Sequence, residues 1–439
     1  MSRNRVSAEP ETAKIVDTML DGRGVADAPG KKVFVDDVLK GETVRFRRRK
    51  KRRNYDEAEL LEVIEASPER IEPLCEAFGM CGGCALQHLS TDGQLSLKQA
   101  TMLDNLQRIG SVTPERILTP IQGSAWGYRR KARLAVKHVY KKGRVLVGFR
   151  ERNKPYVANM NRCETLHPSL GDRFEDLSAL IEGLSIHDRL PQIECAVGDN
   201  ATAMIFRVLD APSDKDLQAF AEFGQKFDIQ IFLQTGGPDS VVPLPGQGVP
   251  EPLHYRIPES DAEITFTPTD FLQVHGEVNL LMIRQALELL APDKESRVLD
   301  FFCGLGNFSL PLARQSGQVI GMELAEDMIR RAKQNAANSG IENVTFLQAD
   351  LTQPLASLEP LQGVNRILLD PPRTGAAELI DPLLALKAER IVYVSCHPGT
   401  LARDAGRLVH EGGYQLVAAG VMDMFPQTSH VESMALFQR

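Results

Sequence analysis

In the C-terminal part of the chain, short apolar runs alternate with amphipathic stretches of helical spacing. Each apolar run is short enough for a strand buried between helices, and the pattern starts near Asp261. Alternating strands and helices are typical of a parallel sheet with a Rossmann-like connection. The expected strands are residues 296–300, 318–323, 343–350, 366–370 and 391–396, followed by a closing pair at 417–426 and 431–437.

The first 68 residues have a different pattern. Five short β-type segments separated by turn residues lie between residues 14 and 65. This spacing predicts a small barrel of the OB type, a fold that commonly binds single strands. Eight cations fall within the nine residues 45–53, which we expect on a loop between the fourth and fifth strands. Such a loop would bind phosphates.

Residues 69–260 are expected to form a β-rich central domain, and residues 261–439 a third, α/β domain. Apolar residues recur at helical spacing over 93–109, which predicts a helix there. A second basic stretch, Tyr128–Lys137, lies on an expected strand. Cys195 fits an apolar core strand.

Composition and charge limit the compartment in which we expect the protein and the ligands that it can bind. The chain has 439 residues, 43% hydrophobic and 25% charged, with a net charge of −7. No apolar run is long enough to cross a bilayer and no signal peptide is evident, so we expect a cytoplasmic protein. In that compartment the seven cysteines are not a disulfide framework. The negative charge argues against indiscriminate nucleic-acid binding, so any contact with RNA must come from local patches.

Three cysteines are clustered early in the central domain. Cys75, Cys81 and Cys84 lie within ten residues, and Cys163 is the next cysteine along. Clustered thiols in a reducing compartment are typical of a metal site, and the spacing alone allows either zinc or an iron–sulfur cluster. The separations of five and two residues disfavour a radical enzyme that cleaves S-adenosylmethionine.

A glycine turn follows the first strand of the expected parallel sheet. Gly304 and Gly306 lie in this turn, and Glu323 ends the next strand, where Rossmann-like sites bind ribose hydroxyls. Asp350 ends the third strand and is suited to adenine. The turn lacks the full pyrophosphate pattern, so S-adenosylmethionine fits better than NAD. Cys303, inside the turn, fits a packing role.

The strand that ends at Cys396 is followed directly by a helical pattern beginning at Pro398. This places a thiol at the carboxyl edge of the sheet, where such folds keep their active sites, and near a helix start that should lower its pKa. Asp370, followed by two prolines, ends the preceding strand at the same edge. Glu432 stands at the start of the last strand, beside His430.

Taken together, these motifs resemble the bacterial 5-methyluridine RNA methyltransferases, and within that family the branch that methylates uracil 1939 of 23S rRNA. The resemblance covers nearly the whole chain. It depends on the glycine-containing barrel (a TRAM domain), the cysteine cluster ending in Cys84-Ala-Leu-Gln-His, Phe271-Leu-Gln273, Asp370-Pro-Pro-Arg373, the Ser-Cys396 motif and the terminal His-Val-Glu432-Ser-Met.

The resemblance implies a set of roles for residues of this chain. Cys396 would be the nucleophile and Glu432 the base, and the helix near 93–109 would pack on the catalytic domain. A monomer that acts on 23S rRNA is expected. The implied contacts to S-adenosylmethionine are Gln273, Phe302, Asn307, Glu323, Asp350 and Asp370, and the implied ligands of a 4Fe-4S cluster are Cys75, Cys81, Cys84 and Cys163. Three positions depart from the usual family pattern, namely His275, Asp350 and His397.

The chemistry of these residues agrees with the resemblance. Carbon 5 of uracil is a poor nucleophile, so a thiolate that adds to carbon 6 would create an enolate able to accept a methyl group, and a base would then remove the carbon 5 proton. The target base must also leave its stack. The alternatives are methylation of another uridine in rRNA or tRNA, methylation of an exocyclic amine, which needs no cysteine, and an RNA-binding iron–sulfur protein with a vestigial S-adenosylmethionine domain.

Overall fold

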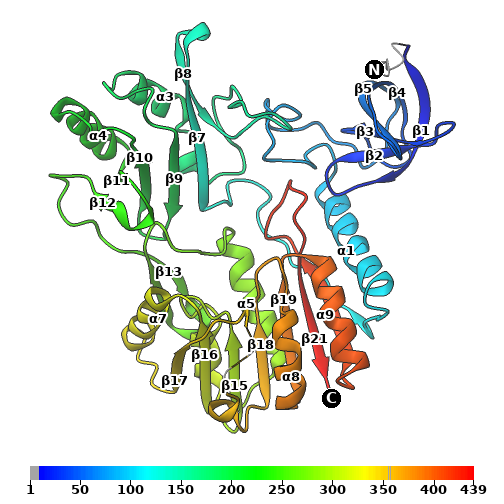
Figure 1. Ribbon diagram of the computed structural model, residues 1–439, viewed down its shortest axis with the longest axis vertical. Helices are drawn as coiled ribbons and strands as arrows, with labels where there is room; N and C mark the ends of the chain where they lie inside the picture. The colour runs from blue at the N-terminus through cyan, green and yellow to red at the C-terminus, as the bar shows by residue number, and fades with distance from the viewer. Residues whose placement is uncertain (1–8, 354, 356) are drawn as a thin grey trace.

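The computed structural model describes residues 9–353, 355 and 357–439, and Figure 1 shows the arrangement of its parts. A closed barrel with the strand order β1-β2-β3-β5-β4 forms the N-terminal part. It encloses a small apolar core that includes Ile15, Val33, Val44 and Phe46. Its strands are β1 (Glu11–Thr18), β2 (Arg23–Ala26), β3 (Lys32–Asp36), β4 (Thr43–Lys51) and β5 (Tyr55–Glu65).

The central part is a six-stranded sheet with the order β12-β11-β10-β9-β7-β8. Neighbouring strands are antiparallel except β10 and β11, which are parallel and connected through α4. A core of its own lies between the sheet and its helices. The elements are β7 (Lys131–Val139), β8 (Arg144–Gly148), α2 (Pro168–Gly171), α3 (Phe174–Glu182), β9 (Gln192–Val197), β10 (Thr202–Arg207), α4 (Asp214–Phe227), β11 (Ile229–Gln234) and β12 (Val241–Pro243).

An eight-stranded sheet with the order β17-β16-β15-β18-β19-β21-β20-β6 forms the largest part. Its first five strands are parallel, and β21 pairs antiparallel with both β19 and β20. The hairpin β13–β14 precedes this sheet, and β14 packs against α7. The strands are β13 (Leu253–Ile257), β14 (Ala262–Phe266), β15 (Arg297–Phe301), β16 (Gln318–Glu323), β17 (Val344–Gln348), β18 (Arg366–Leu369), β19 (Arg390–Ser395), β20 (Gln415–Met422) and β21 (Glu432–Gln438).

Helices cover both faces of this sheet, which explains why its strands are apolar on both sides. Figure 1 shows α8 and α9 near β19 and β21, with α7 near β16 and β17. The helices are α5 (Gly276–Leu290), α6 (Ser309–Gln315), α7 (Glu326–Asn338), α8 (Ile380–Leu386) and α9 (Pro398–His410). Short 3-10 turns lie at Tyr140–Lys142, Pro238–Ser240, Pro258–Ser260, Glu359–Leu361 and Ala377–Leu379.

A segment from the first third of the sequence also belongs to this sheet. Helix α1 (Thr91–Arg108) begins at Ser90, whose hydroxyl accepts from the N–H of Gly93, and packs on α9 and β20. Strand β6 (Arg116–Ile117) pairs with β20 at the sheet edge. Figure 1 shows α1 running beside α9 below the barrel. Residues 91–117 therefore lie against the C-terminal half of the chain.

The expected phosphate-binding loop is corrected by the structure, because residues 45–51 form most of strand β4 (Thr43–Lys51). Most of these cations face acids of the barrel within ion-pair distance. The pairs are Arg45–Glu62 (2.5 Å), Arg47–Glu59 (2.5 Å), Arg48–Glu11 (2.7 Å), Arg49–Asp36 (3.2 Å) and Arg52–Glu57 (2.9 Å). Much of the positive charge is therefore balanced within the barrel itself.

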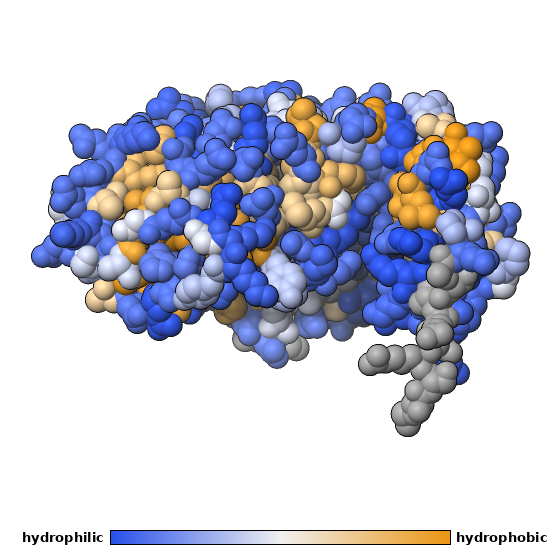
Figure 2. Space-filling view, turned by 90° about the horizontal axis from the view of Figure 1, so that it is seen from above, coloured by the Kyte–Doolittle hydropathy of each residue, from blue (hydrophilic) through white to orange (hydrophobic). Residues whose placement is uncertain are grey.

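Two surface features complete the description. The face seen in Figure 2 is mainly hydrophilic, with an apolar patch at the end of the molecule that the barrel occupies. Exposed apolar side chains of the barrel include Val16, Leu61 and Ile64. No helix in the described part of the chain is long and apolar enough to cross a membrane.

Candidate active site

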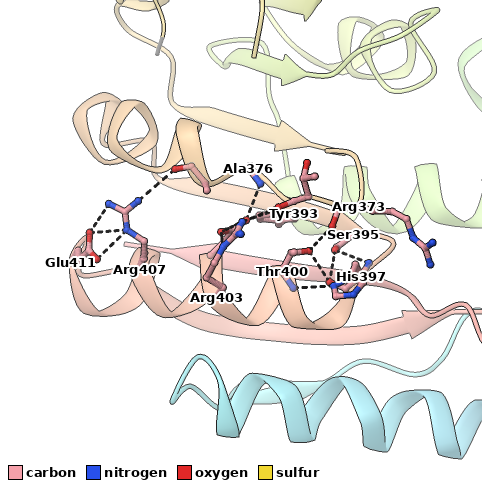
Figure 3. Close-up of polar contacts among 12 residues, drawn as sticks. Arg373, Ala376, Tyr393, Ser395, His397, Thr400, Arg403, Arg407 and Glu411 are labelled. Atoms are coloured by element: carbon pink, nitrogen blue, oxygen red, sulfur yellow. Dashed lines mark hydrogen bonds and ion pairs between the residues drawn. The ribbon is translucent and has the colours of Figure 1, made fainter. Parts of the chain in front are cut away.

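The turn between β19 and α9 places Cys396 at the carboxyl edge of the sheet. Helix α9 begins at Pro398, and the Nδ1 atom of His397 accepts from the N–H of Thr400 (3.2 Å) as its N-cap. Figure 3 shows His397, Thr400, Ser395 and Arg373 gathered at the start of this helix. The thiol is partly buried, so it is covered by the fold and still accessible.

Glu432 lies across from Cys396 because of the strand register. Ser395 of β19 pairs with Ser433 of β21, so the next positions outward on the two strands are Cys396 and Glu432. The glutamate is only 4% exposed. Two residues 36 positions apart in the sequence are thereby brought to one point of the sheet edge.

Asp370 and Arg373, in the turn after β18, complete this group of charges. Burial raises the pKa of Cys396 most, the carboxylates of Glu432 and Asp370 raise it further, and Arg373 lowers it, so all three charges act on the thiol. The side chain of Arg373 also contacts the Nδ1 atom of His430 (3.1 Å). The sequence motif contained Arg373 but gave it no role, since nothing in the pattern says which charge it faces.

The pKa of the thiol differs from the sequence-based expectation. Burial, followed by the charges of Glu432 and Asp370, raises the pKa of Cys396 to about 11, and Arg373 only partly opposes them. The start of α9 does not lower the pKa of Cys396 enough to offset burial, and the reason is local. Pro398 has no N–H, and the N–H of Thr400 is already bound by His397, so neither residue offers a free donor to a thiolate.

The two carboxyl groups are also held toward their protonated forms. Burial, with Asp370 nearby, raises the pKa of Glu432 well above its ordinary value. Burial raises the pKa of Asp370 to about 7, although the hydrogen bond from Gln273 opposes this. The cluster is thus acidic, buried and short of positive charge, which suits a cationic ligand.

The expected S-adenosylmethionine contacts follow the same edge. Gln273 Nε2 donates to Asp370 Oδ2 (3.2 Å), which joins two of the expected contacts directly. Glu323 ends β16 and accepts from the N–H of Gly304 (3.3 Å) in the glycine turn. Phe302, in the same turn, has a φ of 63°.

The remaining two expected contacts have other partners in the structure. Asn307 Oδ1 accepts from the Tyr255 hydroxyl (2.9 Å) and from Asn279 (3.0 Å), inside a polar network. Asp350, after β17, accepts from the Thr352 hydroxyl (2.6 Å). Tyr255 and Asn279 were missed by the sequence analysis, because neither lies in a motif.

The histidine found at position 275 is the N-cap of α5. Its Nδ1 atom accepts from the N–H of Val278 (3.4 Å), its Nε2 atom lies 3.0 Å from the carbonyl oxygen of Ser124, and its ring stacks on Tyr128. It lies two residues beyond Gln273. This histidine therefore helps to fix the segment that carries Gln273.

A second candidate site is formed by the four cysteines expected to bind metal. They line one cavity, together with Phe78, Gln87, Phe149, Met160 and Thr428. Burial raises the pKa of Cys81 to about 11 and that of Cys84 to about 12, and the neighbouring cysteines add to the effect. Among the described residues, no three His, Cys, Asp or Glu side chains are arranged to hold a metal ion.

Similarity to known proteins identifies the family. A family model described as tRNA (Uracil-5-)-methyltransferase matches residues 201–439. A 23S rRNA (uracil(1939)-C(5))-methyltransferase RlmD from Alkalilimnicola ehrlichii is 50% identical, over 100% of this chain and 98% of the relative. The chain belongs to the RNA (uracil-5-)-methyltransferase family. Proteins with the same description from Stenotrophomonas maltophilia and Methylococcus capsulatus are each 48% identical over 100% of this chain and 99% of the relative.

The fold of this RNA (uracil-5-)-methyltransferase is also found among solved structures. The crystal structure of Pyrococcus abyssi tRNA (uracil-54, C5)-methyltransferase in complex with S-adenosyl-L-homocysteine covers 97% of this chain and 100% of its own. Its TM-score is 0.73 at 23% identity. The mixed α/β architecture expected from the sequence is confirmed at this level, and the N-terminal five-stranded barrel is present.

Proposed function

We propose that this enzyme methylates carbon 5 of uracil 1939 in 23S rRNA, with S-adenosylmethionine as the methyl donor. Relatives at 48–50% identity over the whole chain carry that activity in their names. The observation that carries the proposal is the position of Cys396 and Glu432, each next to the paired residues Ser395 of β19 and Ser433 of β21. Methylation of an exocyclic amine would need neither group.

The reaction begins at Cys396. Its thiolate adds to carbon 6 of the uracil, and the electron pair displaced from the carbon 5–carbon 6 double bond makes an enolate at carbon 5. Because the resting thiol has a raised pKa, the site must first lose a proton. Arg373 favours this loss, since its positive charge stabilises the thiolate.

Glu432 acts after the methyl group has been transferred. Its carboxylate takes the proton from carbon 5, the bond between carbon 6 and sulfur breaks, and the electron pair returns to Cys396. The high pKa of Glu432 makes it a strong proton acceptor once ionised.

The acidic edge of the sheet fits the methyl donor. S-adenosylmethionine supplies a methyl group on a positively charged sulfur when it is bound. Asp370, Glu323 and Gln273 would hold it, and a cation beside Asp370 would relieve the cost of burying that carboxyl group. Phe302, Asn307 and Asp350 are the other contacts that we propose.

The four clustered cysteines would hold a 4Fe-4S cluster. Support comes from the all-thiol donor set around one cavity and from the raised pKa of Cys81 and Cys84, because a bound metal stabilises buried thiols as thiolates. Held by these residues, a cluster would link Cys163 to the Cys75–Cys84 segment. Residues 69–260 would then be the iron–sulfur domain.

The N-terminal barrel would be an OB-type TRAM domain that binds RNA, attached to a catalytic domain at residues 261–439, in a monomer. A large groove supports this proposal. It lies beside the barrel and reaches Ser429, three residues before Glu432. Its charged lining is mixed, with the bases Arg23, Arg49, Lys50, Arg52, Arg152 and Lys154 and the acids Asp21, Asp36, Asp37, Glu57 and Glu151. RNA in this groove would lead to the catalytic edge.

The different roles of Cys396 and Glu432 provide a test of this mechanism. Cys396→Ala should bind S-adenosylmethionine and RNA but form no adduct and transfer no methyl group. In Glu432→Gln, Cys396 should still attack and the methyl group should still be transferred. A methylated RNA–protein adduct should then accumulate and survive denaturing gel electrophoresis. The assay uses labelled 23S rRNA fragments and a labelled methyl donor. Methylation by Cys396→Ala would refute the mechanism.

A further inference from the structure

The loop Asp423–Val431 connects β20 to β21 and carries Glu432 at its end. Met422 of β20 pairs with Glu432 of β21, so the loop closes this hairpin at the catalytic edge. Its conformation therefore sets where the Glu432 carboxyl group lies relative to Cys396. A loop of this length needs outside contacts to keep one conformation.

The middle of the loop is held by α1 through Gln427. This residue has a left-handed φ of 70°, which is unfavourable for a side chain other than glycine. The Gln94 side chain bonds to it twice, as donor to Gln427 Oε1 (3.0 Å) and as acceptor from Gln427 N (2.9 Å). The Gln427 carbonyl oxygen accepts from the N–H groups of Ala85 (2.9 Å) and Leu86 (3.0 Å).

The start of the loop is held one helical turn further along α1. Lys98 Nζ donates to Asp423 Oδ1 (2.7 Å) and to the carbonyl oxygen of Phe425 (3.0 Å). The side chains of Lys98 and Asp423 are each 1% exposed. A buried lysine is costly for a fold unless it is fully paired, so its partners are strongly fixed.

The other side of the loop faces the cysteine cavity. The Tyr128 hydroxyl donates to the carbonyl oxygen of Pro426 (2.9 Å), and Thr428 lines the cavity with the four cysteines. Ala85 and Leu86, which bind Gln427, directly follow Cys84. The loop is thus clamped between α1 and the cysteine segment.

We propose that Gln94 and Lys98 of α1 are positioning residues for the methylation reaction. They hold the loop Asp423–Val431 in the one conformation that places Glu432 opposite Cys396. This inference rests on the proposed function, in which Glu432 removes the carbon 5 proton. It assigns a role in the chemistry to a helix more than 300 residues away in the sequence.

Displacement of the loop Asp423–Val431 should slow one step of the reaction, the release of the product. A displaced Glu432 slows the transfer of the carbon 5 proton to its carboxylate, and so delays the break of the carbon 6–sulfur bond. Cys396 and the methyl donor site lie on other strands, so attack and methyl transfer continue. Misplacement of a reacting group by about 1 Å can cost about 100-fold in rate.

The experiment is a single-turnover assay of the full-length protein with labelled 23S rRNA fragment and S-adenosylmethionine. In Lys98→Met we expect the methylated adduct on denaturing gels to last 10- to 100-fold longer than in the wild type. The affinity for S-adenosylmethionine should change less than twofold. Arg108→Met is the matched control, because Arg108 lies on α1 and its ion pair among the described residues is with exposed Asp104.

A second variant protects the test against misfolding. Gln427→Gly removes the side-chain bond from Gln94 Nε2 to Gln427 Oε1 and keeps the backbone N–H and carbonyl contacts of residue 427. Glycine also suits the left-handed φ, so this variant should fold and show the same long-lived adduct. If both variants release product at the wild-type rate, or lose activity only in proportion to the folded fraction, the positioning role is refuted.

Two further results separate this inference from the proposed function. Lys98→Met added to Glu432→Gln should leave the adduct lifetime of Glu432→Gln unchanged, because both changes act on one step. A further increase in lifetime would overturn the positioning role alone. If Glu432→Gln traps no adduct, the proposed function fails and the inference with it.

Discussion

The thiol of Cys396 should react slowly with alkylating agents in the resting enzyme, because burial and nearby carboxylates keep it protonated. A thiol at a helix start should titrate below its ordinary pKa, whereas burial and two carboxyl groups raise the pKa of Cys396 to about 11. From the ordinary value of 9.0, a rise of two pH units lowers the thiolate fraction near neutral pH about 100-fold. We therefore expect iodoacetamide to alkylate Cys396 about 100-fold more slowly than an ordinary cysteine at pH 7.5.

The assay is alkylation as a function of pH, read at the Cys396 peptide by mass spectrometry. Cys396→Ser supplies the background from the other six cysteines. Glu432→Gln should lower the midpoint, because it removes a carboxylate that opposes the thiolate, and Arg373→Met should raise it. Glu411→Gln, at the far end of α9 (Figure 3), should leave the midpoint unchanged.

A midpoint at or below 9 in the wild type would refute this reasoning. It would mean that the helix start outweighs burial and the neighbouring carboxyl groups. The midpoint could also be raised in the wild type and unchanged in both Glu432→Gln and Arg373→Met. In that case burial alone would raise the pKa of Cys396, and the proposed effect of the neighbouring charges would be wrong.

Three further predictions follow from other parts of the chain. Anaerobically purified protein should be brown with about four irons per chain, and Cys81→Ala should lose the colour; stoichiometric zinc would contradict this. Lys50, Lys51 and Arg53 have no acidic partner among the described residues. Replacing these three by Gln should reduce the slope of log affinity for RNA against log salt concentration by about 2. Replacing the ion-paired arginines of β4 should leave this slope unchanged. Burial lowers the pKa of His275, so the unfolded chain takes up a proton first as the pH falls below about 6.5. His275→Asn keeps a cap without this proton and should lose less thermal stability between pH 7.5 and 5.5, as measured by thermal denaturation.

The parts of the molecule that depend on local pattern could be predicted from the sequence. The apolar strand ending at Cys396, the glycine turn before Asn307 and the five barrel strands all depend on neighbouring residues, and all are present. The basic run could not be placed correctly, because its ion pairs reach acids such as Glu11 and Glu62, from two other strands of the barrel. Charge along a sequence does not show which charges meet in space.

The same limit applies to the active site. The types of residue at Cys396 and Glu432 carry the chemistry and were found from motifs. Their protonation and alignment depend on Arg373, on the capping of α9 and on the contacts of α1 with the Asp423–Val431 loop. Lys98 is an unremarkable helical lysine in the sequence, and only its burial against Asp423 reveals that it holds the segment next to the base. A motif therefore identifies the reacting groups, and the surrounding packing determines whether each is in the charge state and position that its step requires.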